Sequence, residues 1–285
     1  MKDPIAAIES YLDRLTAGWT LPANLVAAIR YSLLGGGKRL RPLLAWRCCE
    51  AVGAKGEASL AAGAAVELIH AFSLVHDDLP AMDDDDLRRG KPTLHIHAGE
   101  AMAILAGDAM MTLAFEHLVA KVSDSPLADG LVRELSQATT GMIAGQVYDS
   151  LGGFPAGLTD HEKLVLIHRN KTGALIRAAC RMGAMSGKAS EQHLNAITRY
   201  SEAVGLMFQV VDDLLDIEST PEQTGKRTRK DATAGKLTFP GLLGVAQSKA
   251  EVRRLTQEAA DAVVVLGPPA TALIELAERM SQRTH

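Results

Sequence analysis

Six aspartates lie within ten residues of the sequence, directly after a strongly apolar stretch. They are Asp77, Asp78, Asp83, Asp84, Asp85 and Asp86. Helical spacing puts His70, Ser73 and Asp77 on one face. Pro80 ends regular helix, so Asp83 can turn back toward Asp77. Because runs of charge usually face water, a solvated acidic loop is the alternative interpretation.

A second acidic cluster follows about 135 residues later, in 208–216. Gln209, Asp212 and Asp216 share one helix face, and Asp213 adjoins them. Carboxylates one helical turn apart repel each other, and these are embedded among apolar residues, so a cation must offset the cost. Magnesium prefers carboxylate oxygens and is typically completed by substrate phosphates. The two clusters therefore predict two walls of one metal–diphosphate site.

Basic residues accompany both clusters. In 35–42 a glycine triplet precedes Lys38 and Arg41, a turn suited to gripping a diphosphate through charge-assisted hydrogen bonds. The spacing is not that of a P-loop. Arg88 and Arg89 directly follow the first acidic cluster.

Further basic residues lie later in the sequence, at Lys171 and in 226–236. Lys171 falls among Leu164, Ile167 and Leu175, where a simple amphipathic helix would not place a charge; a snorkelling lysine is the alternative. The longest predicted loop is crowded with basic residues and would be able to close over bound phosphate. These are Lys226, Arg227, Arg229, Lys230 and Lys236.

The elements that must position these residues are helical along nearly the whole chain. Apolar or small residues recur at steps of three and four, and no convincing alternating run indicates a strand. The sequence predicts an all-α fold of roughly ten helices in a single domain spanning 1–285. The helical segments are 59–75, 98–122, 131–147, 162–185, 191–217 and 271–280. Helix breaks are expected at 35–37, 53–56, 123–130, 152–159, 186–190, 219–235 and 267–269.

Composition excludes several classes of protein. A net charge of -4 and an aromatic content of 4% argue against a nucleic-acid binder. The first residues lack the pattern of a signal or transit peptide, and no run of about 18 apolar residues is free of charge and proline. We therefore expect a soluble, cytoplasmic protein without a membrane span. Cys48, Cys49 and Cys180 are expected to be reduced packing residues.

In order, these motifs resemble those of the trans-isoprenyl diphosphate synthases, the polyprenyl synthetase family, and most closely its bacterial farnesyl diphosphate synthases. The resemblance runs from about residue 31 to residue 240. Segment 36–42 looks like the isopentenyl diphosphate grip, 77–90 like the first aspartate-rich motif, and 212–216 matches the second, Asp-Asp-x-x-Asp. Further matches fall at 145–146, 171–172, 208–209 and 231–236. The resemblance implies an isoprenoid synthase fold, with the helices around a central active-site cavity.

The resemblance also implies roles for the site residues. Asp77, Asp83 and Asp212 would ligate Mg²⁺, three ions per active site completed by substrate diphosphate. Further ligands, or partners of the ligands, would be Asp78, Asp213 and Asp216. The allylic diphosphate would be held by Arg88, Lys171 and Lys226, with Lys236 close by. The isopentenyl diphosphate pocket would contain Gly37, Lys38, Arg41, His70 and Arg89. Oxygen dipoles from Thr172 and Gln209 would face an allylic cation.

The implied activity is magnesium-dependent head-to-tail (1'-4) condensation of isopentenyl diphosphate with dimethylallyl and geranyl diphosphates, giving (2E,6E)-farnesyl diphosphate. Product length should depend on the pocket below Asp77. Ser73 lies one turn down and Phe72 about 7.5 Å along the axis. In the family an aromatic residue at this position limits chain growth. A homodimer is also implied. One departure is Arg229, where the family's closing loop has glycine.

Alternatives remain at this stage. Within the family, a geranylgeranyl or geranyl diphosphate synthase would differ only in its pocket floor. A terpene cyclase is disfavoured because the grip of Lys38 and Arg41 would have no second substrate to hold. A catalytically inactive regulatory subunit, which binds diphosphates without turnover, is the candidate from a different class.

Overall fold

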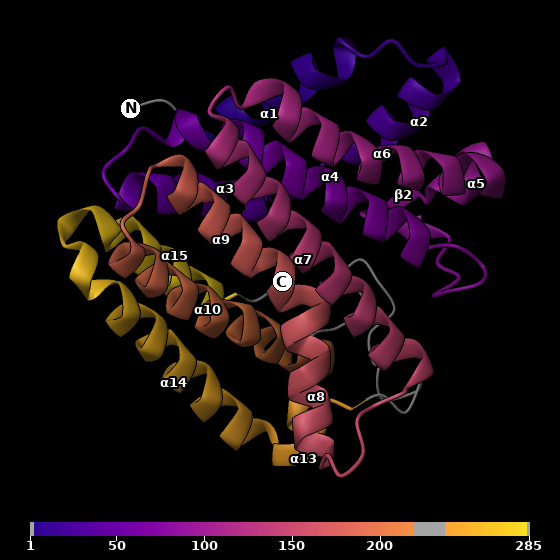
Figure 1. The fold of residues 1–285 in the computed structure, drawn as a ribbon. Helices are drawn as coiled ribbons and strands as arrows, with labels where there is room; N and C mark the ends of the chain where they lie inside the picture. Colours follow the sequence, from indigo (N-terminus) through magenta and orange to yellow (C-terminus); the bar gives the residue numbers. More distant parts are fainter. Residues whose placement is uncertain (1–2, 219–236, 284–285) are drawn as a thin grey trace.

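The structure is a computed structural model that describes residues 3–218 and 237–283. The chain is helical almost throughout, which confirms the all-α prediction (Figure 1). The first three helices are α1 (Pro4–Ala17), α2 (Ala23–Leu33) and α3 (Leu40–Ala51). The middle of the chain forms α4 (Leu60–Asp77), α5 (Leu94–Ala98), α6 (Glu100–Lys121) and α7 (Ser125–Leu151). The remainder forms α8 (Asp160–His168), α9 (Ala174–Ser186), α10 (Glu191–Glu218), α13 (Phe239–Leu243), α14 (Val245–Val263) and α15 (Thr271–Ser281).

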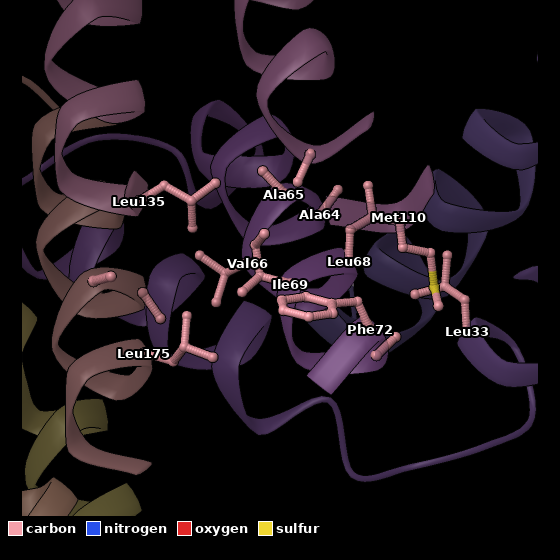
Figure 2. Packing of buried hydrophobic residues seen from close by; sticks show 14 of the residues in the cluster. Leu33, Ala64, Ala65, Val66, Leu68, Ile69, Phe72, Met110, Leu135 and Leu175 are labelled. Atoms are coloured by element: carbon pink, nitrogen blue, oxygen red, sulfur yellow. The ribbon is translucent and has the colours of Figure 1, made fainter. Parts of the chain in front are cut away.

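The long helix α4 carries the first acidic cluster at its carboxyl end. It is apolar on nearly every side because it packs against α3, α6 and α9 at once. Figure 2 shows its core residues Ile69 and Phe72 among side chains from α2, α6, α7 and α9. A rigid, buried helix therefore leads directly to the aspartates.

A second apolar core lies between α10, α14 and α15. Tyr200 of α10 is fully buried there, and its hydroxyl donates to the carbonyl of Leu273 at 2.8 Å. Both α3 and α9 contribute to the two cores, and they lie between the N-terminal and C-terminal helices in Figure 1. Cys48, Cys49 and Cys180 are buried and free, as the sequence analysis expects.

The predicted helix break at 123–130 is wrong in its extent, because α7 already begins at Ser125. The side chain of Asp124 caps this helix by accepting from the backbone N–H of Leu127 at 3.3 Å. Pro126 stands in the first turn, where its missing N–H costs no helical hydrogen bond. Polar and small residues that read as a loop are thus the first turns of a 27-residue helix.

The predicted continuous helix 162–185 is interrupted. A π-helical turn, η2 (Arg169–Gly173), separates α8 from α9. Such a turn adds a residue to the helix and rotates the following side chains relative to a regular 3.6-residue repeat. Lys171 belongs to this turn. The sequence analysis placed it on an apolar helix face because it assumed one continuous regular helix.

A small hairpin follows the first acidic cluster, although no strand was predicted. Its strands β1 (Leu87–Arg88) and β2 (Lys91–Pro92) pair antiparallel. The two turn residues, Arg89 and Gly90, have φ of 53° and 74°. Positive φ at both positions is typical of a tight type I′ turn, and the hairpin is too short for alternation to reveal it.

Two helical segments, Gly56–Asp77 and Glu100–Lys121, are long and apolar enough to cross a membrane by length and composition alone. In the first, 67% of the apolar window is buried inside the molecule, as in the core helix of a globular protein. The described residues therefore contain no clear membrane span. In the second, only 39% is buried, so α6 presents an apolar face outward.

Candidate active site

The chain folds back on itself just after α4, as the sequence predicts. The backbone N–H of Asp83 donates to the carbonyl of Asp77 at 2.9 Å, which brings the two aspartates to the same helix end. Burial raises the pKa of Asp77 to about 6, Lys171 acts in the opposite direction, and Asp83 raises it further. A carboxylate in this position gains strongly from a cation placed beside it.

Asp78 has a different environment from its neighbour. It is only 3% exposed, and both of its carboxylate oxygens accept from Nε of Arg88 at 2.9 Å, with Nη2 of Arg88 2.5 Å from Oδ1. Such a forked pair fixes the guanidinium in one orientation. The sequence left open whether Asp78 is a ligand or a partner; this geometry favours a partner that orients Arg88.

The glycine loop and the hairpin meet through Arg89. Nη1 of Arg89 donates to the carbonyl of Gly36. Gly37 has φ of +136°, and a Cβ at this residue would lie 2.7 Å from Nη1 of Arg89. Glycine is therefore favoured at Gly37 by its backbone conformation, and a side chain there would displace the guanidinium of Arg89. The loop and Arg89, which the sequence assigned to one pocket, are brought together.

Arg39, to which the sequence analysis gave no site role, anchors this loop from inside. It is 3% exposed, and its guanidinium pairs with Glu9 of α1 at 2.6 Å and with Glu67 of α4 at 2.9 Å. Its φ of 47° is left-handed, so the backbone turns sharply before α3 begins. Of the cations in this motif, Arg39 is structural and Lys38 is exposed, a division that residue types alone do not reveal.

His70 lines a small pocket with Arg39, Arg88 and Arg89. The pocket lies between α2, α4 and the hairpin. Burial lowers the pKa of His70 well below its ordinary value, and four surrounding arginines lower it further. The imidazole is therefore neutral at physiological pH, and the positive charge of the pocket comes from the arginines. An anionic group suits such a pocket.

Arg41 lies deeper, near Glu67, Arg89 and Asp212, and burial lowers its pKa. Its Nε is buried without a hydrogen-bond partner among the described residues. Buried donors in folded proteins are normally satisfied, so this guanidinium nitrogen is available for a polar group that the described residues do not supply. Arg41 also lies close enough to Asp212 of the second acidic cluster to respond to its charge.

In the second cluster, neighbouring aspartates again differ. Asp213 is 7% exposed, accepts from the backbone N–H of Phe239 at 2.8 Å and lies 3.5 Å from Nε2 of His168. It thus ties α10 to α8 and α13, as a partner and not as a free ligand. The side chain of Asp212 is 42% exposed and accepts from Nε2 of Gln209 at 3.2 Å. Asp216 follows one turn later and is half-buried.

The π-helical turn holds Lys171 against α7. Nζ of Lys171 lies 2.5 Å from Oδ2 of Asp149, and the turn also carries Thr172. The sequence analysis missed Asp149; the available signal was its position three residues after Gln146 on the same helix. Lys171 also lowers the pKa of Asp77, which places this turn beside the first acidic cluster.

The donor set fits magnesium. No three His, Cys, Asp or Glu side chains within the described ranges gather into a metal-binding group. Magnesium is usually bound by one or two carboxylates together with waters and substrate phosphates, so it does not need such a cage. Asp77, Asp83 and Asp212 are carboxylates of the required kind, at the end of α4, in the turn after it and on α10. The predicted phosphate contacts Lys226 and Lys236, and Arg229, lie outside the described residues.

Below the acidic cluster, Phe72 is 6% exposed and packs with Leu33 of α2 and Met110 of α6 (Figure 2). Its ring meets the ring of His76 edge to face, with centroids 5.4 Å apart. Ser73 is half-buried, and its hydroxyl donates to the carbonyl of His70 at 3.0 Å. The aromatic ring thus fills the space between α2, α4 and α6.

Comparison with known proteins places these features in context. Residues 22–263 match the family model described as polyprenyl synthetase. The chain is 46% identical over 249 residues to geranylgeranyl pyrophosphate synthase 11 of Arabidopsis thaliana, covering 84% of this chain and 69% of the relative. A solved geranyltransferase from Legionella pneumophila has a TM-score of 0.86 at 35% identity, covering 99% and 95% of the two chains. An FPP/GFPP synthase from Zymomonas mobilis has a TM-score of 0.84 at 35% identity, covering 97% of each chain.

Proposed function

Because the chain belongs to the polyprenyl synthetase family of prenyltransferases, we propose that it condenses isopentenyl diphosphate head to tail with allylic diphosphates. The observation that carries this proposal is the convergence of cations on the buried carboxylate of Asp77. Arg88 is fixed by Asp78, and Lys171 approaches from the π-helical turn. An allylic diphosphate bound here would meet preorganised positive charge where its leaving group develops negative charge.

The two substrates would be held by different cations. Arg88 and Lys171 would bind the allylic diphosphate, with Lys226 and Lys236 as further proposed contacts. The pocket of His70 and Arg89 would hold isopentenyl diphosphate, with Lys38 and Arg41 beside it. A neutral His70 would serve there as a hydrogen-bonding group and not as a charge.

We further propose that the cations bound between the acidic clusters are magnesium ions, with three ions in each active site. When bound, they would supply charge neutralisation to the departing diphosphate. Asp77, Asp83 and Asp212 would hold them, with Asp216 as a further ligand. Asp78 and Asp213 would act through their partners, because each is buried and bound to a protein donor, whereas the side chain of Asp212 is partly exposed.

The reaction then needs no protein nucleophile. The allylic carbon–oxygen bond breaks, and its electron pair leaves with the diphosphate. The double bond of isopentenyl diphosphate forms the new carbon–carbon bond, and a proton is lost, with the departing diphosphate as the proposed base. The amide nitrogen of Gln209 donates to Asp212, so we propose that its oxygen, with the hydroxyl oxygen of Thr172, stabilises the allylic cation.

Two product lengths are supported by different observations. The buried ring of Phe72 below Asp77 favours the C15 product, (2E,6E)-farnesyl diphosphate. The 46% identity to a geranylgeranyl pyrophosphate synthase favours the C20 product. Incubation with magnesium, isopentenyl diphosphate and either dimethylallyl or geranyl diphosphate, followed by mass spectrometry, decides between them. A C10 product would instead indicate a geranyl diphosphate synthase.

The same experiment tests the alternative of a regulatory subunit without turnover. Condensation that disappears on chelation supports the proposed enzyme. Well-folded protein that binds the substrates but yields no product would support the inactive subunit.

We also propose that the chain forms a homodimer through the outer face of α6. Ile104, Leu105 and Val119 on this helix are 45%, 57% and 67% exposed. Their spacing, with Asp108 and Thr112 between them, follows one stripe of the helix. Several large apolar side chains exposed on one helix face, here with polar residues between them, are typical of an interface with another chain. We further propose that residues 1–285 form one domain, because α3 and α9 contribute side chains to both apolar cores. The cytoplasmic location stays a prediction.

A further inference from the structure

Arg283 lies two residues beyond the end of α15 and contacts the second acidic cluster. Its Nη2 lies 2.7 Å from Oδ1 of Asp212 and also donates to the carbonyl of Phe208 at 3.2 Å. The guanidinium stacks over the ring of Phe208, 4.0 Å from the ring centre. Three separate contacts therefore attach this arginine to α10 beside a proposed metal ligand.

The charge of Arg283 suits the site that it occupies. The side chain of Asp212 is partly exposed; its partial burial raises its pKa, whereas Arg283 favours the ionised form. The other polar partner of this carboxylate is the neutral amide of Gln209. The side chain of Arg283 is itself only 16% exposed, so the pair is weakly screened by solvent. The cation that the cluster requires is thus supplied by the chain itself.

We propose that Arg283 is an internal substitute for the metal at Asp212, which must leave when metal and diphosphate bind. The inference rests on the proposed function, because it concerns a ligand of the proposed magnesium site. A guanidinium and a divalent cation that both approach the carboxylate of Asp212 repel each other, so the binding of one opposes the binding of the other. Metal binding at α10 would therefore be coupled to release of the segment after α15.

Competition of this kind has a directional consequence for metal affinity. Without substrate, the apparent affinity of α10 for a divalent cation equals its intrinsic affinity multiplied by the fraction of molecules in which the pair between Arg283 and Asp212 is broken. A diphosphate brings additional oxygen ligands and tips the balance toward the metal. Arg283 would thus be a positioning residue that reserves the second cluster for metal bound together with substrate.

The test is the affinity of the substrate-free protein for Mn²⁺, measured by electron paramagnetic resonance. We expect Arg283→Gln to bind Mn²⁺ about three- to tenfold more tightly than the wild type, since it loses one partly buried ion pair. Arg279→Gln is the matched control, because Arg279 is also basic and near the end of α15 but donates to the carbonyl of Glu275. Its affinity should equal that of the wild type.

A second measurement uses the unaltered protein. Hydrogen exchange of backbone amides near Arg283 should become faster on addition of Mg²⁺ with inorganic diphosphate. Unchanged exchange there would overturn the inference, as would equal or weaker Mn²⁺ binding by a folded Arg283→Gln variant, or tighter binding by the Arg279→Gln control. Arg283→Lys keeps the charge but lacks the planar guanidinium that contacts Asp212 and stacks on Phe208, so the affinity of this variant should lie between those of the glutamine variant and the wild type.

Failure of the proposed function is distinguishable from failure of this inference. Absence of prenyl transfer, together with Mn²⁺ affinity that depends on Arg283, would reject the condensation and retain the competition. Normal condensation with Mn²⁺ affinity independent of Arg283 would do the reverse.

Discussion

Adjacent aspartates in both clusters have taken on separate tasks. Asp78 and Asp213 are buried and bound to protein donors, whereas Asp77 and Asp212 lie beside them at the proposed metal site. In a helix, consecutive side chains point about 100° apart, so the two members of each pair meet different surroundings. Each pair of adjacent aspartates therefore contains one proposed cation ligand and one residue that fixes the neighbouring side chains in place.

The raised pKa of Asp77 leads to a prediction about stability. Its folded-state pKa of about 6 exceeds the ordinary value of 3.8, so the folded protein binds a proton more readily than the unfolded chain. The charged carboxylate thus destabilises the metal-free fold above pH 6, and this cost disappears as the pH falls toward 4. We expect Asp77→Asn to stabilise metal-free protein by about 1 to 2 kcal/mol at pH 7.5 while abolishing condensation.

Chemical denaturation at pH 7.5 and pH 4.5, with chelator present, measures this effect. The gain should shrink at the lower pH, where Asp77 is protonated in the wild type. Asp129→Asn, on an exposed part of α7, is a control that should change neither value. An Asp77→Asn variant less stable than the wild type at pH 7.5 would contradict the burial argument.

Phe72 is the residue on which the C15 proposal depends. If its ring forms the pocket floor, reducing the side chain through Phe72→Leu to Phe72→Ala should lengthen the product step by step. The cavity left by alanine would also destabilise the fold by about 3 kcal/mol. Mass spectrometry of the products gives the chain length. An unchanged distribution from active, folded Phe72→Ala would show that other residues limit growth.

The acidic and basic motifs were recognisable in the sequence, because clustered charges on apolar helices are costly unless they bind something, and their joint metal–diphosphate site stays a prediction. Which task each of these residues performs was not predictable from the sequence. Arg39 and Arg41 lie two residues apart with the same charge, yet one is neutralised by Glu9 and Glu67 and the other has an unpaired nitrogen. That difference depends on contacts with α1 and α4, which no local pattern encodes.

At the scale of elements, the approach of α7 to the π-helical turn positions Lys171. A Cβ on Gly145 would lie 2.1 Å from the backbone N of Lys171 and 2.6 Å from its Cα. Backbone atoms cannot move aside cheaply, so Gly145→Ala must push the turn away from α7. We expect it to destabilise the protein by about 2 kcal/mol or more and to reduce kcat/KM for the allylic substrate strongly.

Gly141→Ala is the matched control on the same helix. Its Cβ would meet Ala174 at 3.3 Å and Asn170 at 3.5 Å, close but tolerable contacts, and alanine also favours the helix. Thermal unfolding and steady-state kinetics of both variants test the argument. Equal effects at the two glycines would contradict a specific role for the contact with Lys171.

The helices themselves were predictable from their period, whereas their interruptions were only partly so. Glycine pairs mark the ends correctly around α3 and α7, but the π-helical turn carries no distinctive residue and arises from packing against Gly145. The hairpin at Arg89 is too short to show a period of two. Sequence propensity therefore predicts a helix or strand well, except where contacts with other elements change its local geometry.

At the scale of the whole molecule, the exposed face of α6 predicts the oligomeric state. Leu105→Glu combined with Val119→Glu would place two carboxylates in the proposed interface. We expect sedimentation analysis to show that the variant is mainly monomeric where the wild type is a dimer. Val264→Glu is the control, because Val264 is 67% exposed, as Val119 is, but lies after α14. Dissociation by both changes, or by neither, would contradict a specific interface on α6.

The anchoring of Arg39 has a practical consequence for where the chain can be cut. The family match begins at residue 22, so α1 and its Glu9 lie outside the matched region, as does Arg283 at the far end. A fragment cloned to those boundaries would leave a buried guanidinium with one counter-ion where it now has two, directly behind the glycine loop. Expression designs that trim to the matched segment would thus weaken the substrate pocket from a site that never touches substrate.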